Sequence, residues 1–178
     1  MMKTYILNVA GVTRELPIVK LTDDLSIASF VILGDVELVV NAASELVKRM
    51  PEVDVLVTAE AKGIPLVFEM ARLLNMKKYI VARKNVKPYM KNPIVDEVVS
   101  ITTQKKQILC LEEKDVEAIR GKRVAIVDDV ISTGESIEAI ERLVKAAGGI
   151  VTTKASILAE GDAKDRDDII YLEYLPLF

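Results

Sequence analysis

The sequence predicts an α/β fold in which a central, mostly parallel sheet is flanked by helices. Two segments carry this prediction, because residues 53–58 and 124–127 form apolar runs without alternation. Such runs are typical of strands that are covered on both faces. Each run leads into a short turn containing glycine and then into apolar residues at helical spacing. Strands that alternate with helices in this way favour parallel pairing.

The length and composition of the chain indicate one domain. The chain has 178 residues, 51% of them hydrophobic, and no linker rich in Pro, Gly or Ser divides it. This is long enough for a substantial core, so we predict a single domain over residues 1–178. No apolar run approaches the roughly 18 residues of a membrane span, and the N-terminus lacks the apolar region of a signal peptide. We therefore expect a cytoplasmic protein with no membrane partner.

Several kinds of chemistry are excluded by residue content. The chain contains no histidine, which rules out Ser-His and Cys-His nucleophiles and histidine-ligated metals. Its single cysteine, Cys110, cannot form an internal disulfide and is expected to be a small buried residue. The formal net charge of −3 argues against general binding of nucleic acid.

The first half of the chain contains the following expected elements. Residues 4–33 carry short apolar runs broken by turn residues, which indicates strands and turns in a lid or edge element. Asp35 is the expected N-cap of a helix that Pro51 closes. The strand at 53–58 is then followed by the turn at 59–63 and a second helix.

The second half is expected to continue the alternation of strands and helices. Its predicted strands lie at residues 79–83, 98–101, 108–111, 124–127, 150–158 and 169–172. The strands 98–101 and 108–111 are joined by a polar segment and predict a mobile hairpin. Apolar residues at helical spacing predict a helix that Gly148 and Gly149 end. Residues 160–168 form a charged loop.

One stretch concentrates the residues suited to chemistry. Asp128 and Asp129 follow the apolar run, and a turn of small and hydroxyl residues then opens a helix. Free N–H groups at such a helix start bind phosphate, and two adjacent carboxylates suit the vicinal hydroxyls of a ribose. A plain turn with an N-cap is the simpler alternative. A nucleotide-binding GxxxxGK[ST] loop is absent, because no Lys follows Gly134.

The segment VAIVDDVISTGES resembles the signature of the type I phosphoribosyltransferases, which bind phosphoribosyl pyrophosphate (PRPP). The resemblance implies that fold, with a small hood from roughly residues 1–33 and the C-terminus, and a flexible hairpin loop. It implies that Asp128 and Asp129 are catalytic and face the ribose. The implied contacts of the 5-phosphate are Ser132, Thr133, Gly134, Glu135 and Ser136.

Two further segments resemble the pyrophosphate-binding parts of the adenine enzymes. The turn at 59–63 is similar to their pyrophosphate loop, with Lys62 where they usually carry Arg, and RKNVKP is similar to their R-K-x-x-K-x-P segment. The implied pyrophosphate contacts are Ala61, Lys62, Gly63, Arg83, Lys84 and Lys87.

The hood and the flexible loop match the adenine enzymes less well. GVTRELPIV is similar to their G-V-x-x-R-D-I segment, which makes Val12 and Arg14 candidate base contacts. The flexible catalytic loop has TTQKKQ in place of Ser-Leu-Glu-Tyr-Gly. Its candidate residues are Thr103, Gln104, Lys105 and Lys106.

Taken together, the resemblance implies a purine phosphoribosyltransferase, with adenine as the first choice of base. Such an enzyme transfers ribose 5-phosphate from PRPP to a base nitrogen and releases pyrophosphate, in purine salvage. It implies Mg²⁺ held mainly by the substrate, with Asp128 and Asp129 as further ligands, and a homodimer. A 6-oxopurine or another base stays open as the substrate. A regulator that senses PRPP without catalysis is the alternative from another class, and the unusual loop favours it.

Overall fold

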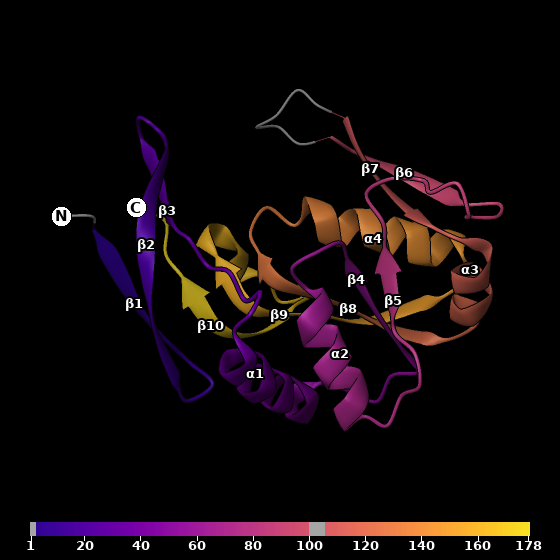
Figure 1. The fold of residues 1–178 in the computed structure, drawn as a ribbon, viewed down its shortest axis with the longest axis horizontal. Helices are drawn as coiled ribbons and strands as arrows, with labels where there is room; N and C mark the ends of the chain where they lie inside the picture. The colour runs from indigo at the N-terminus through magenta and orange to yellow at the C-terminus, as the bar shows by residue number, and fades with distance from the viewer. Residues whose placement is uncertain (1–2, 100–105) are drawn as a thin grey trace.

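The computed structural model describes residues 3–99 and 106–178, and it has a five-stranded central sheet (Figure 1). Every neighbouring pair of strands in this sheet is parallel, as the unbroken apolar runs predict. In spatial order the strands are β10 (Ile170–Leu175), β9 (Ile150–Glu160), β8 (Arg123–Ile131), β4 (Val55–Ala59) and β5 (Ile80–Ala82).

Helices cover both faces of the central sheet. Helices α1 (Val36–Arg49) and α2 (Ile64–Leu73) pack against each other on one face, and α4 (Glu135–Ala146) lies on the other face (Figure 1). Residues of β8 alternate between two apolar clusters, with Val127 packed toward α1 and α2 and Ile126 toward α4. This two-sided burial explains why the strand is apolar without alternation.

The N-terminal residues form a separate antiparallel sheet, which we call the hood. It consists of β1 (Thr4–Val9), β2 (Val12–Thr22) and β3 (Leu25–Ala28) and stands at one end of the molecule (Figure 1). The chain returns to it at the C-terminus, where Phe178 N donates to Ser26 O at 2.9 Å and Ser26 N donates to Phe178 O at 2.6 Å. The prediction of strands and turns for residues 4–33 is confirmed over the three strands.

The predicted hairpin is also present. Strands β6 (Ile94–Val99) and β7 (Lys106–Leu111) pair in antiparallel register, and β6 packs on α4. Backbone hydrogen bonds of 2.9 Å in each direction join Arg83 to Cys110, so β7 lies antiparallel beside the chain that follows β5. Cys110 is fully buried, as expected. Thr103, Gln104 and Lys105 lie outside the described residues, and Lys106 begins β7.

Several elements differ from the prediction, and β6 begins at Ile94, four residues before the predicted strand 98–101. Strand β8 continues through Asp128 and Asp129 to Ile131, because β9 stays paired beside it. A short helix, α3 (Glu113–Ile119), was not predicted, since only Val116 and Ile119 show helical spacing in its seven residues. The charged loop 160–168 contains a 3-10 helix (Gly161–Asp165).

Candidate active site

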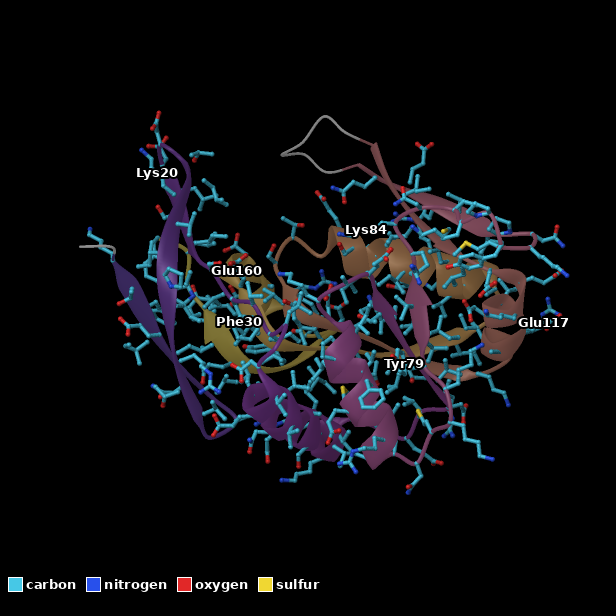
Figure 2. All side chains as sticks on the ribbon, viewed as in Figure 1. Lys20, Phe30, Tyr79, Lys84, Glu117 and Glu160 are labelled. Carbon is cyan, nitrogen blue, oxygen red and sulfur yellow. The ribbon has the colours of Figure 1, made fainter. Side chains whose placement is uncertain are left out.

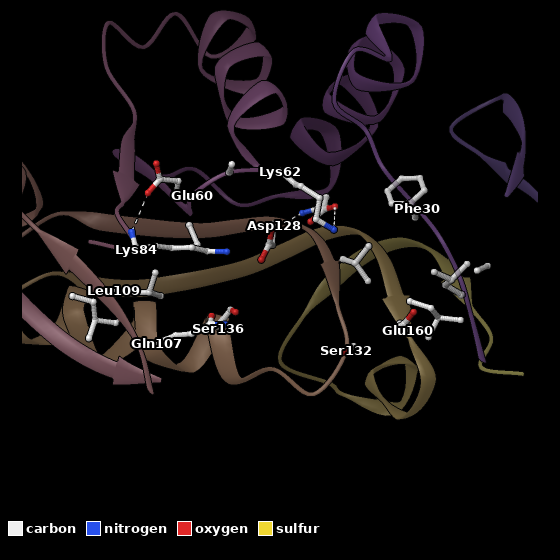
Figure 3. A pocket seen from close by; sticks show the side chains of 18 residues that line it. Phe30, Glu60, Lys62, Lys84, Gln107, Leu109, Asp128, Ser132, Ser136 and Glu160 are labelled. Atoms are coloured by element: carbon white, nitrogen blue, oxygen red, sulfur yellow. Dashed lines mark hydrogen bonds and ion pairs between the residues drawn. The ribbon is translucent and has the colours of Figure 1, made fainter. Parts of the chain in front are cut away.

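The strand order places a crevice between the carboxyl ends of β4 and β8. From β4 the chain continues to β5 on one side, and from β8 it continues to β9 and β10 on the other. Open α/β sheets bind ligands at such a switch in strand order. A cavity of about 450 Å³ lies there (Figure 3), lined by residues of the hood, the turn after β4, β7, β8 and β9.

Asp128 and Asp129 lie side by side in the floor of this cavity. The Asp129 N–H donates to Asp128 Oδ1 at 2.9 Å, and only 3% of Asp129 is exposed. Burial, together with the charge of Asp129, raises the pKa of Asp128 to about 8. Asp128 therefore keeps its proton at neutral pH.

Lys62 reaches the acid pair from the turn that follows β4. Its Nζ lies 3.1 Å from Asp129 Oδ2. The turn is pressed against the end of β4, since a Cβ on Gly63 would lie 2.1 Å from Thr58 Oγ1 and 3.4 Å from Asp128 Oδ1. The glycine thus permits the turn to approach both strands closely. Ala61 and Lys62 line the cavity, whereas Gly63 packs behind it.

The predicted phosphate loop, residues 132–136, joins β8 to α4. Gly134 adopts a left-handed conformation with φ of 88° and caps α4 without a side-chain hydrogen bond. The N–H groups of the first turn are therefore available to an anion. Ser132 and Ser136 line the main cavity, and the whole loop lines a hollow of about 80 Å³ beside Asp128.

The basic segment after β5 contributes one of its three predicted cations to the cavity. Lys84 lines the cavity, whereas Arg83 and Lys87 do not. Glu60 explains the position of Arg83, because its carboxylate pairs with Arg83 Nη2 at 3.2 Å. The Glu60 carboxylate also accepts from Lys84 N at 3.0 Å (Figure 3). The hydrogen bond from Lys84 N is the main cause that lowers the pKa of Glu60.

The structure does not bring Val12 and Arg14 to the cavity. Val12 is buried in the core beneath the hood. Arg14 forms ion pairs with Asp35 at 2.7 Å and with Glu37 at 2.8 Å, which draw its guanidinium to the start of α1. The hood instead contributes the end of β3 and the residues after it. Those that line the cavity are Ile27, Ala28 and Phe30.

Other cavity residues were missed from the sequence. Glu160 ends β9 and lines the cavity, as do Val130 and Leu175. The sequence does contain a feature that points to Glu160 as a site residue. Glu160 directly follows a run of buried strand residues, as Asp128 does. From β7 the cavity receives Gln107, Ile108 and Leu109.

Comparison with known proteins agrees with this geometry. A model of the phosphoribosyl transferase domain matches residues 36–175. The hypoxanthine/guanine phosphoribosyltransferase of Methanotorris igneus is 32% identical over 126 residues, which are 70% of this chain and 64% of that protein. The adenine phosphoribosyltransferase of Thermotoga petrophila is 36% identical over 124 residues, which are 66% of this chain and 69% of that protein. The chain thus spans less than two thirds of the Methanotorris relative.

A solved structure is also similar to this chain. The adenine phosphoribosyltransferase of Thermoanaerobacter pseudethanolicus superposes with a TM-score of 0.67 at 25% identity and covers 80% of this chain and 84% of that chain. The family model spans α1 to β10, which includes the acid pair and the phosphate loop. This chain therefore belongs to the phosphoribosyltransferase family.

Proposed function

We propose that the protein transfers ribose 5-phosphate from PRPP to a nitrogen of a purine base and releases pyrophosphate. One observation carries the proposal. The acid pair lies in a single cavity between Lys62 on one side and the phosphate loop on the other. A sugar that carries phosphate at one end and diphosphate at the other matches this order of groups.

The charges of the site suit the bond that breaks. Cleavage of the C1–O bond develops positive charge on the ribose and negative charge on the leaving diphosphate, and fixed charges that complement both lower the barrier. Asp128 and Asp129 would face the ribose, and their oxygens accept hydrogen bonds from its hydroxyls. Lys62 and Lys84 would face the diphosphate, because both are cations that line the cavity.

The phosphate loop would hold the other end of the substrate. Backbone N–H groups at the start of α4 and the hydroxyls of Ser132, Thr133 and Ser136 are donors suited to a phosphate dianion. With the 5-phosphate anchored there, the ribose lies over the acid pair. Such anchoring converts binding energy into orientation of the reacting atoms.

The acid pair also fits the Mg²⁺ that the family implies. Two carboxylates at one edge of a cavity suit a hard cation that takes its other ligands from substrate oxygens and water. Asp128 and Asp129 would hold the ion together with the substrate. When bound, Mg²⁺ would neutralise part of the diphosphate charge.

Adenine is the base that we propose first. The resemblance of the pyrophosphate-binding segments supports it, and so does the similarity to solved enzymes that are named adenine phosphoribosyltransferases. Hypoxanthine and guanine are the second choice, because the Methanotorris relative is named for them. We further propose a homodimer and a cytoplasmic location. No helix in the described part of the chain is long and apolar enough to cross a membrane.

The proposal is tested by pyrophosphate release. Protein, Mg²⁺ and PRPP are mixed with adenine, hypoxanthine, guanine, xanthine or orotate in separate reactions. We expect release with a purine, and its loss in the double variant Asp128→Asn and Asp129→Asn. The matched control is Asp23→Asn with Asp24→Asn, an adjacent exposed pair at the turn of the hood. Tight PRPP binding without release for any base would instead favour a PRPP-sensing regulator.

A further inference from the structure

The cavity has an apolar end that the reaction chemistry described above leaves unassigned. It lies where the hood meets the central sheet, on the opposite side of Lys62 from Glu60 and Lys84 (Figure 3). Phe30 and Glu160 lie together in this region (Figure 2). The apolar side chains that line it are Ile27, Ala28, Phe30, Val130 and Leu175.

Among the described residues, Glu160 is the one acidic side chain at this end of the cavity. It is the last residue of β9, stands in register with Leu175 of β10, and is partly buried. In the described residues its carboxylate has no hydrogen bond or ion pair, whereas Glu60 and Asp129 each have a partner. Burial raises the pKa of Glu160, and the charge of Lys62 opposes part of this rise.

An unpaired carboxylate in an apolar compartment is unfavourable by itself. Glu160 is only partly buried, so its carboxylate loses part of its hydration without gaining a donor in return. A ligand that presents N–H groups to this carboxylate removes that penalty when it binds. A flat aromatic ligand would at the same time contact Phe30 and the aliphatic side chains around it.

The proposed transferase would hold the base in this compartment, and we propose that the Glu160 carboxylate accepts hydrogen bonds from an exocyclic amino group of that base. The preferred substrates are then aminopurines, adenine or guanine. Hypoxanthine and xanthine are disfavoured, because neither base carries an exocyclic amino group. This inference rests on the proposed transferase function and adds the choice of base to it.

The expected preference is substantial because it arises from a mismatch of polar groups. A site that is built to hydrogen-bond a substrate group rejects an analogue that lacks the group far better than it rejects a missing methylene. Since Glu160 is only partly buried, we expect aminopurines to be favoured by at least about tenfold in kcat/KM. The shape of the apolar pocket contributes equally to all four bases.

The test compares the wild type with Glu160→Gln on adenine, guanine, hypoxanthine and xanthine. Glutamine has nearly the same shape but donates as well as accepts, so the preference for aminopurines should fall to about threefold or less. The KM for PRPP should stay within about twofold, because the diphosphate binds at the other end. Glu173→Gln is the matched control, since Glu173 lies on the neighbouring β10 and is exposed. Circular dichroism and thermal unfolding check that both variants fold.

Each contrary outcome has a distinct meaning. Turnover with a purine but an unchanged base ranking in Glu160→Gln overturns this inference and leaves the transferase intact. A wild type that prefers hypoxanthine or xanthine overturns it too. A variant that loses PRPP affinity and keeps its ranking places the carboxylate on the diphosphate and Mg²⁺ instead. No turnover with any purine overturns the transferase proposal and this inference together.

Discussion

Lys62 Nζ lies 3.1 Å from Asp129 Oδ2, so the cation proposed for the leaving diphosphate is paired with a carboxylate proposed for the ribose. The two side chains differ in environment, because 48% of the Lys62 side chain is exposed but only 4% of the Asp129 side chain. Lys62 can therefore turn toward an incoming diphosphate at low cost, whereas Asp129 cannot leave its place. The ion pair joins the two halves of the site, β4 with its turn and β8.

Lys62→Gln should weaken PRPP binding. The change removes a charge from the diphosphate side and leaves a buried carboxylate without its cation. We expect the affinity for Mg²⁺ and PRPP to fall by about tenfold, and stability to fall by about 1 kcal/mol. Titration calorimetry and urea unfolding measure the two effects. Lys77→Gln, which changes an exposed lysine outside the cavity, is the control. Equal PRPP affinity in the two variants would remove Lys62 from the site.

Asp128 should make the protein less stable as pH rises. Its pKa is raised from 3.8 to about 8 in the folded protein, so the folded state binds a proton that the unfolded state releases. The free energy of unfolding therefore falls between about pH 4 and pH 8, by at most about 1.4 kcal/mol for each pH unit.

Asp128→Asn removes this titration and should flatten the pH profile. Because Asp128 is partly exposed, we expect the variant to gain roughly 2 kcal/mol relative to the wild type between pH 5 and pH 8. Urea unfolding at pH 5, 6.5 and 8 measures the difference. Parallel profiles for wild type and variant would contradict the raised pKa.

Gly63→Ala should disturb the turn after β4 through a single contact. The backbone of Gly63 has φ of −70°, which alanine adopts without strain, so only the 2.1 Å approach of the new Cβ to Thr58 Oγ1 matters. We expect a loss of about 2 kcal/mol in stability, typical of overpacking.

A double-mutant cycle isolates that contact. Thr58→Ala removes the oxygen that the new methyl group would strike, so Gly63→Ala should cost much less in that background. A favourable coupling of at least about 1 kcal/mol between the two substitutions is expected from urea unfolding. Additive effects would show that the cost of Gly63→Ala has another origin.

Arg14→Gln should affect the base more than PRPP. Arg14 ties β2 to Asp35 and Glu37 at the start of α1, and the segment from β3 to α1 carries Phe30 into the cavity. Loss of these ion pairs should let the segment that carries Phe30 shift, and a misplaced binding group orients its ligand poorly. We therefore expect the KM for the base to rise by about threefold to tenfold and the Kd for PRPP to stay unchanged.

Arg72→Gln is the matched control for Arg14. Arg72 makes a similar two-point ion pair with Glu69 inside α2, at 2.7 and 2.8 Å, and does not line the cavity. Both variants should lose at most about 1 kcal/mol of stability. Steady-state kinetics with the base varied, and with PRPP varied, separate the two effects. A rise in both Michaelis constants would assign Arg14 a general structural role.

Some features of this protein follow from short stretches of sequence. The apolar runs of β4 and β8 predict buried parallel strands, and Asp35 predicts the start of α1, where its carboxylate accepts from Leu38 N at 3.1 Å. The acid pair and the phosphate loop are predictable for the same reason. Their chemistry is contained in the nine consecutive residues 128–136, so local backbone geometry alone places them together.

Other features depended on contacts between distant residues. Arg14 looked like a base contact from its neighbours in sequence, yet its partner Asp35 lies 21 residues away and holds it elsewhere. Glu160 and Phe30 meet in one cavity because β9 and the hood end at the same edge of the central sheet. Turn and strand preferences are local, so the residues that could carry the chemistry are predictable from the sequence. Which of these residues share a cavity depends on strand order and register, and packing across the whole chain sets both.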